Sequence, residues 1–208
     1  FLSMSTELSS DTSMADHISE LHRYTYLSNS DAHSLGKIAR EYQALQLKEP
    51  SFKEFYYALH HVEGRAVTKN FGMNPQLGKY YTTVCQQCFT TVKMTDQICP
   101  ACGSSKIVNG VFDRIQQLKD HDKIENNTRP PYIHHVPLDY LPSLGPKTYE
   151  KLLTHFQTEM NIIHHVSYED LIQVIPEKLA KLIIAMRAGK LTFQAGGGGK
   201  YGKVTDSL

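Results

Sequence analysis

Apolar residues recur at regular spacings in the first half of the chain and predict its elements. Spacings of i, i+4 and i+7 over 14–21 predict a short amphipathic helix, and an aromatic, β-favouring run over 23–28 predicts a strand. An S-x-x-E capping box followed by apolar residues at helical spacing predicts a helix over 52–62. A last strand is expected over 65–68. The Gly, Asn and Pro content of 70–80 then predicts a loop.

The second half of the chain alternates between extended and helical patterns. Residues 106–115 alternate around an Asn-Gly pair and predict a hairpin, and 120–129 reads as an exposed linker. Prolines force extended backbone over 130–138. A glycine turn followed by proline then predicts a helix from Pro146, and capping and apolar signals predict two more helices over 167–189.

Length, hydropathy and charge narrow the class of protein. A chain of 208 residues with 40% hydrophobic residues suits two or three small domains, and no apolar run approaches the ~20 residues of a membrane span. We therefore expect a soluble, cytoplasmic protein. The net charge is only +1, yet 178–203 holds six Lys or Arg and no acid. A basic end on a neutral protein favours a polyanionic partner, although a solvated helix face is the alternative.

All four cysteines lie in two CxxC pairs ten residues apart: Cys85, Cys88, Cys99 and Cys102. Four converging thiolates match the tetrahedral preference of a closed structural Zn²⁺ site, so we predict a small zinc ribbon with strand pieces at 89–92 and 97–98. Disulfides or a redox dithiol are the alternatives. Disulfides need a secreted context, and no stretch resembles a signal peptide; a redox CxxC needs no second copy.

Asp31 and His33 lie in the stretch that follows the strand predicted at 23–28. A carboxylate and an imidazole two residues apart at a strand end point the same way and can share one cation. On local grounds alone, Asp and Ser beside a strand end are more typical of turn and N-cap residues.

Two stretches near the C-terminus suggest contacts with DNA phosphates. Gly145 and Lys147 lie where a helix begins, so that backbone N–H groups and a cation could face a phosphate, although a purely structural helix pair fits equally well. The glycine run before Lys200 and Tyr201 is typical of a flexible tail, but bare backbone beside a cation and an aromatic ring also suits a phosphate and a stacked base.

Several of these motifs resemble a known superfamily. TYLSNSDAHSLGKIAREY is similar to the closing metal motif of the PHP phosphoesterases, in which the residues matching Asp31 and His33 bind catalytic metal. NFGMNPQLGKYYTTVCQQC, CPACG, RPPYIHHVPL and AGGGGKYG together resemble one branch, the endonuclease Q family of DNA-repair nucleases. The resemblance covers nearly the whole chain in order, and it favours the DNA-contacting interpretation of the glycine-rich end.

The resemblance implies a multidomain α+β protein. It would comprise the C-terminal part of a PHP-type α/β barrel over 1–79, a zinc-ribbon domain over 80–128, and a helical, helix-hairpin-helix-like DNA-binding domain with its glycine-rich tail over 129–208. It further implies metal-dependent hydrolysis of the DNA backbone 5′ to uracil, hypoxanthine or abasic sites, with Zn²⁺, Mg²⁺ or Mn²⁺ at the catalytic site.

One departure from the PHP pattern matters. PHP sites also take ligands from an early HxH motif, and this sequence has none. We therefore expect the chain to be the C-terminal portion of such an enzyme and, alone, to be inactive or nearly so. The competing interpretations are a non-catalytic zinc-ribbon module that binds nucleic acid, and a PHP phosphoesterase acting on a small substrate, which would need neither the ribbon nor the basic end.

Overall fold

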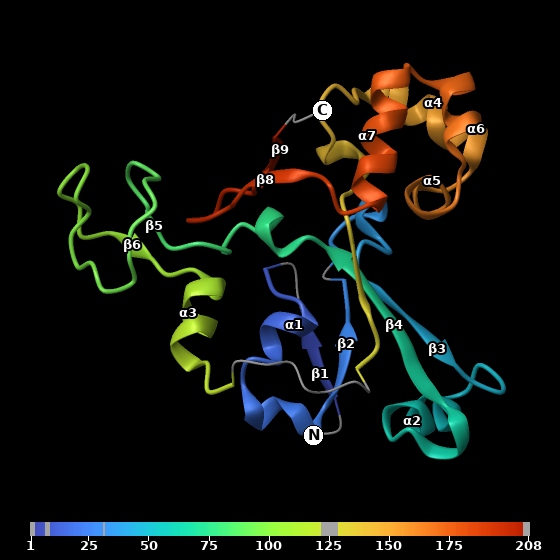
Figure 1. Ribbon diagram of the computed structural model, residues 1–208, viewed down its shortest axis with the longest axis horizontal. Coiled ribbons are helices and arrows are strands. Elements are labelled where there is room, and N and C mark those ends of the chain that lie inside the picture. The colour runs from blue at the N-terminus through green and yellow to red at the C-terminus, as the bar shows by residue number, and fades with distance from the viewer. Residues whose placement is uncertain (1–2, 7–8, 31, 122–128, 206–208) are drawn as a thin grey trace.

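The protein has a mixed α+β fold. The computed structural model describes residues 3–6, 9–30, 32–121 and 129–205, and within these ranges it contains seven α-helices and several small sheets. Figure 1 shows a sheet region, a lobe over residues 80–115 that carries the four cysteines and is called the cysteine lobe below, and a C-terminal group of helices. The α+β class expected from the sequence is confirmed, whereas the barrel and the helix-hairpin-helix stay predictions.

Two small sheets form the sheet region. Strands β1 (Ser3–Thr6) and β2 (Thr25–Ser28) pair in parallel. Strands β3 (Tyr42–Gln46), β4 (Ala66–Met73) and β7 (Tyr132–His135) form the second sheet, with β4 in the centre, antiparallel to β3 and parallel to β7. The predicted strand at the position of β2 and the extended backbone at β7 are confirmed. The loop expected from residue 70 was wrong at its start, because β4 pairs with β3 as far as Phe71 and with β7 as far as Met73.

The predicted helix over 14–21 is broken into α1 (Thr12–Ala15) and a 3₁₀ turn over Ser19–Arg23. Arg129 explains the break, because its guanidinium binds the Asp16 carboxylate at 3.0 Å and takes up backbone carbonyls of this stretch that a continuous helix would use itself. Those carbonyls belong to Leu21, His22 and Tyr24. Arg129 therefore ties the start of β7 to the N-terminal segment, and the exposed linker expected up to residue 129 was wrong at its end.

Helix α2 (Phe52–Leu59) confirms the helix predicted from the capping box. The Ser51 hydroxyl accepts a hydrogen bond from the Glu54 N–H at 3.3 Å, but the Glu54 carboxylate turns to Arg65 and to the backbone of Lys48. Hydrogen bonds from Arg65, then from Lys48, lower the pKa of Glu54 to about 2. The ion pair joins α2 to β4.

The hairpin predicted over 106–115 was wrong. Strand β6 (Ile107–Val108) instead pairs with β5 (Val84–Cys85), and helix α3 (Val111–Leu118) begins directly after Gly110. The backbone N–H of Gly110 donates to the Thr83 hydroxyl at 2.9 Å, and a Cβ here would overlap the 81–83 backbone. Gly110 thus permits a close approach instead of a turn.

Four helices form the C-terminal end: α4 (Pro146–Phe156), α5 (Glu159–His164), α6 (Tyr168–Val174) and α7 (Glu177–Arg187). The predicted start at Pro146, the Ser167 cap of α6 and the stop at Gly189, with φ of +64°, are confirmed; α5 was not predicted. Their apolar faces enclose the larger core, which also takes residues from beside the sheet: Met73, Leu77, Val136 and Leu138. Within the described ranges, no helix has the length and apolar character that crossing a membrane requires.

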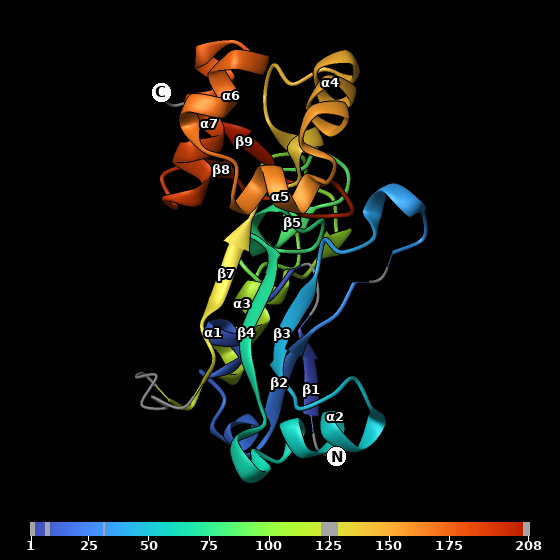
Figure 2. The same ribbon diagram turned by 90° about the vertical axis from the view of Figure 1, so that its right-hand side faces the viewer.

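The glycine-rich end is a packed hairpin. Strands β8 (Thr192–Gln194) and β9 (Lys203–Thr205) pair, and the glycines between them lie against residues 76–84. The N–H groups of Gly196 and Gly202 donate to the carbonyls of Gln76 and Leu77 at 2.8 and 3.0 Å. In Figure 2 the hairpin lies between the helices and the cysteine lobe. These glycines therefore serve close contact between two segments of this chain.

We predict that Gly202→Ala destabilises this hairpin. The added methyl group would overlap the carbonyl oxygen of Gln76 and lie 2.7 Å from that of Gln194, so the free energy of unfolding should fall by about 1–3 kcal/mol. Gly36→Ala is the matched control, since no atom lies within 4 Å of its added Cβ. Equal denaturant midpoints for the two variants would contradict the close packing.

Candidate nucleic-acid cleft and metal centre

The four cysteine sulfurs converge on one point. All four lie within 4.8 Å of one another, and the Cys85–Cys102 and Cys88–Cys99 sulfur pairs are each 3.6 Å apart. Thiolates about 2.3 Å from a tetrahedral Zn²⁺ have sulfur–sulfur edges of about 3.8 Å, whereas a disulfide is about 2.05 Å long. The donor set and its spacing therefore fit a metal ion such as zinc, and all four cysteines are unpaired by disulfides.

The two CxxC pairs form matching knuckles. Phe89 donates its N–H to the Cys85 carbonyl at 2.8 Å, and Gly103 donates to the Cys99 carbonyl at 2.9 Å, each with left-handed φ of 59° and 74°. Of the strand pieces predicted over 89–92 and 97–98, the first is reduced to an antiparallel bridge between Thr91 and Val84, because Phe89 turns the chain, and the second was wrong. The ladder forms between β5 and β6. Hydrogen bonds with Thr90 lower the pKa of Cys88 to about 6, which favours the thiolate that a metal requires.

Lys200 and the glycine loop contact the first knuckle. The Lys200 ammonium lies 3.2 Å from the centroid of the Phe89 ring, and Gly198 faces the side chains of Phe89 and Val84. A left-handed phenylalanine is strained, and here its ring forms the surface on which the loop lies. The structure thus places Lys200, predicted to contact DNA, against the cysteine lobe.

The Asp31/His33 stretch leaves the end of β2. Asp31 lies outside the described residues, and His33 is exposed. Ser28, the last residue of β2, is fully buried, and its backbone N–H donates to the Gln43 side chain at 3.1 Å. The strand that carries the predicted pair is therefore fixed at its end.

A cleft opens beside this stretch. It has a volume of about 40 Å³ and is lined by Ser30, Ala32, Lys37, Arg40, Met73, Tyr140 and Tyr201. The structure brings together here two stretches that the sequence analysis treated separately, because Ser30 and Ala32 flank Asp31 and Tyr201 comes from the glycine-rich end.

Two cations and two aromatic rings line the cleft. Arg40 donates two hydrogen bonds to Asp139 at 2.9 and 3.0 Å, and its guanidinium lies 5.9 Å from the Tyr140 ring. The rings of Tyr140 and Tyr201 meet edge to face at 6.0 Å. Cations beside exposed ring edges are the groups that hold a nucleic-acid backbone and its bases.

Gly145 and Lys147 lie at the start of α4 and are both exposed. The Gly145 carbonyl accepts from the N–H groups of Thr148 and Tyr149 at 3.0 Å, while Pro146 supplies no donor. These two residues are not among those that line the cleft.

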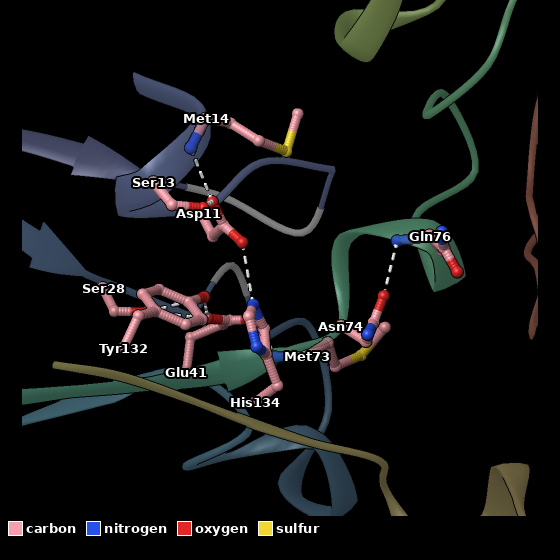
Figure 3. A network of polar contacts seen from close by, with 10 residues as sticks. All are labelled: Asp11, Ser13, Met14, Ser28, Glu41, Met73, Asn74, Gln76, Tyr132 and His134. Atoms are coloured by element: carbon pink, nitrogen blue, oxygen red, sulfur yellow. Dashed lines mark hydrogen bonds and ion pairs between the residues drawn. The ribbon is translucent and has the colours of Figure 1, made fainter. Parts of the chain in front are cut away.

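A buried carboxylate behind the cleft was missed by the sequence analysis. Glu41, 4% exposed, accepts hydrogen bonds from the Ser28 hydroxyl at 2.7 Å, the Met73 N–H at 2.8 Å and the Tyr132 hydroxyl at 3.1 Å (Figure 3). Burial raises the pKa of Glu41 to about 7, although those hydrogen bonds oppose the shift. The one signal in the sequence is Gly72, since glycine inside a strand marks a close approach.

A second acid lies next to this network. Asp11 caps α1 by accepting from the Met14 N–H at 2.8 Å, and its other oxygen meets His134 Nε2 at 2.8 Å (Figure 3). Burial raises the pKa of Asp11, but hydrogen bonds with His134, Ser13 and Met14 outweigh it and lower the pKa overall. Two alternate residues of β7, Tyr132 and His134, thus bind one acid each, Glu41 and Asp11.

We predict that metal removal, or Cys99→Ser, unfolds residues ~80–115 while the four C-terminal helices persist. Three thiolates bind the ion far more weakly than four, and the small cluster of Cys85, Val92 and Cys99 is the buried apolar core found in that lobe. Metal content per chain and hydrogen exchange of the lobe measure the effect. Native disulfides among these cysteines would refute it.

We predict that Glu41 makes stability fall as pH rises from about 4.5 to about 7. In that range the folded chain keeps a proton on Glu41 that the unfolded chain has lost, so folding is disfavoured by up to about 3 kcal/mol, with no further change above. Glu41→Gln cannot ionise and should flatten this part of the curve. Denaturation at several pH values measures it, and identical slopes for both proteins would contradict the shift.

Two known proteins resemble this chain over nearly its whole length. No family model matches the chain. It is 46% identical over 197 residues to the uncharacterized protein YqxK of Bacillus subtilis, covering 95% of this chain and 51% of that protein. It is 34% identical over 221 residues to the uncharacterized protein MJ0043 of Methanocaldococcus jannaschii, covering 95% and 27%.

Two solved structures share the fold at a TM-score of 0.86. One is the lesion-specific endonuclease PfuEndoQ of Pyrococcus furiosus, 34% identical, with 97% of this chain and 54% of that chain covered. The other is endonuclease Q in complex with a 27-mer duplex carrying an abasic lesion at the active site, 33% identical, with 99% and 55% covered. The chain spans about half the length of the two solved chains and of the Bacillus relative, and about a quarter of the Methanocaldococcus relative. Its structure closely matches that of endonuclease Q.

Proposed function

We propose that the chain is part of an endonuclease that cleaves damaged DNA. The observation that carries the proposal is the match to endonuclease Q, which extends over nearly the whole chain at 33–34% identity. This is a level at which sequence and fold agree, so the likeness concerns more than the architecture. The interpretation of the chain as a C-terminal portion, inactive when alone, stays a prediction.

The cleft supplies the groups that a DNA strand requires. Lys37 is an exposed cation for phosphate oxygens, whereas the buried Arg40 guanidinium is already paired with Asp139. Tyr140 and Tyr201 offer their rings to a sugar or base. We place the strand in this cleft because it lies beside the Asp31/His33 stretch, for which the resemblance to PHP phosphoesterases implies binding of a catalytic metal.

The finer proposal concerns the lesion and the bond that is cut. One solved neighbour holds a duplex with an abasic lesion at its active site, which supports a damaged nucleotide as the substrate class. We propose cleavage 5′ to uracil, hypoxanthine or an abasic site, with the lesion turned out of the stack; a damaged or missing base reduces the unstacking cost.

The catalytic metal needs ligands beyond those that the structure describes. Within the described ranges, the four cysteines are the one group of three or more candidate ligands close together, and His33 is not part of such a group. These residues alone do not fit a catalytic metal site, so we derive no step through the metal. We assign Asp31 and His33 as two of its ligands and the cysteines to a structural Zn²⁺.

A non-catalytic nucleic-acid-binding module is the second candidate. The observation that favours it is the lack of a carboxylate and histidine cluster beside His33 among the described residues. Such a module would bind DNA through the same cleft and would cut nothing.

The test is DNA strand cleavage by a protein that contains this chain and is as long as its relatives. Asp31→Asn and His33→Ala should abolish cleavage of uracil-containing or abasic duplex, because each removes a metal ligand, while DNA affinity stays within about threefold since the cations of the cleft remain. Wild-type rates in Asp31→Asn would make Asp31 a helix cap. Binding without any cleavage by the wild-type protein would favour the module.

We predict that the C-terminal lysines act through phosphates. Lys147→Ala and Lys200→Ala should each weaken binding equally across DNA sequences and reduce the slope of log affinity against log salt by roughly one. Lys53→Ala is the control, because α2 lies at the far end of the molecule from α4 (Figure 1). If the salt slopes of both variants match that of the control, neither lysine contacts DNA. If only the slope of Lys200→Ala matches the control, the Lys200 side chain has a structural role on the Phe89 ring.

A further inference from the structure

Glu41 is bound by donors from three strands. Ser28 ends β2, Met73 ends β4 and Tyr132 begins β7. The Ser28 and Tyr132 hydroxyl groups and the Met73 N–H all donate hydrogen bonds to the Glu41 carboxylate. Figure 3 shows the Ser28, Glu41 and Tyr132 side chains grouped beside β4. An ionised carboxylate only accepts hydrogen bonds and has room for several donors, so Glu41 matches this set.

Each of these attachments lies close to the wall of the cleft. Ser28 precedes Ser30 by two residues, Met73 itself lines the cleft, and Arg40 is the neighbour of Glu41 in the chain. Arg40 lines the cleft, whereas its neighbour Glu41 is buried. One buried side chain thus joins three of the segments that form the wall.

Gly72 gives independent support. A Cβ on Gly72 would overlap both the Glu41 carboxylate and the Tyr132 hydroxyl, so the bare backbone of β4 makes room for the two side chains. Gly72 is also in a strand that is paired on both edges, where glycine weakens the strand itself. The glycine therefore serves the placement of Glu41.

Burying this carboxylate is unfavourable, and the fold does not need an acid here for apolar packing. Removing water from Glu41 costs free energy that its hydrogen bonds offset only in part. What the arrangement achieves is a fixed distance between the end of β2, the end of β4 and the residue before β3.

We propose that Glu41 is a positioning residue that holds Ser30, Arg40 and Met73 in one arrangement, so that the cleft presents the DNA strand to the Asp31/His33 stretch. The inference rests on the proposed function. Glu41 is buried behind the wall and touches no substrate, so it acts through the residues that it binds. The same role extends to Ser28 and Tyr132, whose hydroxyl groups complete the attachment.

Hydrogen exchange tests the positioning without any activity. In Glu41→Ala, amides over 29–40 should exchange at least about tenfold faster, while the cysteine lobe and α4–α7 keep their protection. Glu41→Gln can still accept from Met73 and hydrogen-bond the two hydroxyls, so it should restore most of the protection. Glu49→Ala, at an exposed position after β3, is the control for removing a glutamate.

Cleavage by the protein at the length of its relatives gives the second readout. Glu41→Ala should lower kcat about tenfold to a hundredfold with little change in KM, because small displacements of reacting groups are sufficient for such losses. If Glu41→Ala does not fold, Ser28→Ala and Tyr132→Phe each remove a single hydroxyl and should give smaller losses of the same kind.

The outcomes separate the two proposals. Unchanged exchange over 29–40 in folded Glu41→Ala, or a wild-type kcat in that variant, overturns the positioning role while leaving the nuclease intact. If Glu41→Ala exchanges faster while the wild-type protein cuts no damaged DNA, the nuclease proposal is overturned and the positioning role is supported. A loss confined to KM would show that Glu41 affects binding alone and would also overturn the proposal.

Discussion

A buried carboxylate needs hydrogen-bond donors, and the donors to Glu41 lie at the ends of β2 and β4 and at the start of β7. Glu41 accepts hydrogen bonds from hydroxyl and N–H groups of β2, β4 and β7. None of these strands adjoins Glu41 in the sequence, since the strand that follows it directly is β3. The small sheets have few strands and short ladders, so side-chain attachment supplements backbone pairing in setting their relative positions. In the proposed role of Glu41, these contacts hold the chain segments that leave the strand ends at the separations that form the cleft.

The other wall of the cleft depends on the cysteine lobe. Tyr201 reaches the cleft from a loop whose glycines lie against residues 76–84 and whose Lys200 rests on the Phe89 ring of the first knuckle. A metal at the cysteines would order that knuckle, and through Phe89 and Val84 it would order the loop. A metal held by the four cysteines would thus contribute to the shape of the cleft through the glycine loop, without taking part in any reaction there.

Local signals in the sequence predicted local structure well. The capping serines at 51 and 167 and Pro146 mark helix starts because a cap is satisfied within one turn. Predictions that depended on distant partners were wrong: Gly110 reads as a hairpin turn but faces the 81–83 backbone, and Phe89 reads as strand but closes a knuckle. The cysteine cluster was foreseen because its spacing carries its own geometry, whereas a lone glutamate such as Glu41 resembles any surface acid until the fold brings Ser28, Met73 and Tyr132 to it.

The claim at the centre of this account is that a DNA strand lies in the cleft beside the end of β2. Hydrogen exchange of the protein with and without a duplex carrying one abasic site tests this most directly. We expect new protection over residues 29–40, 138–141 and 199–202, which bring together the two walls of the cleft, and no change in α2 at the far end of the sheet. Protection limited to the cysteine lobe or the start of α4, with the cleft segments unchanged at saturating DNA, would contradict the account.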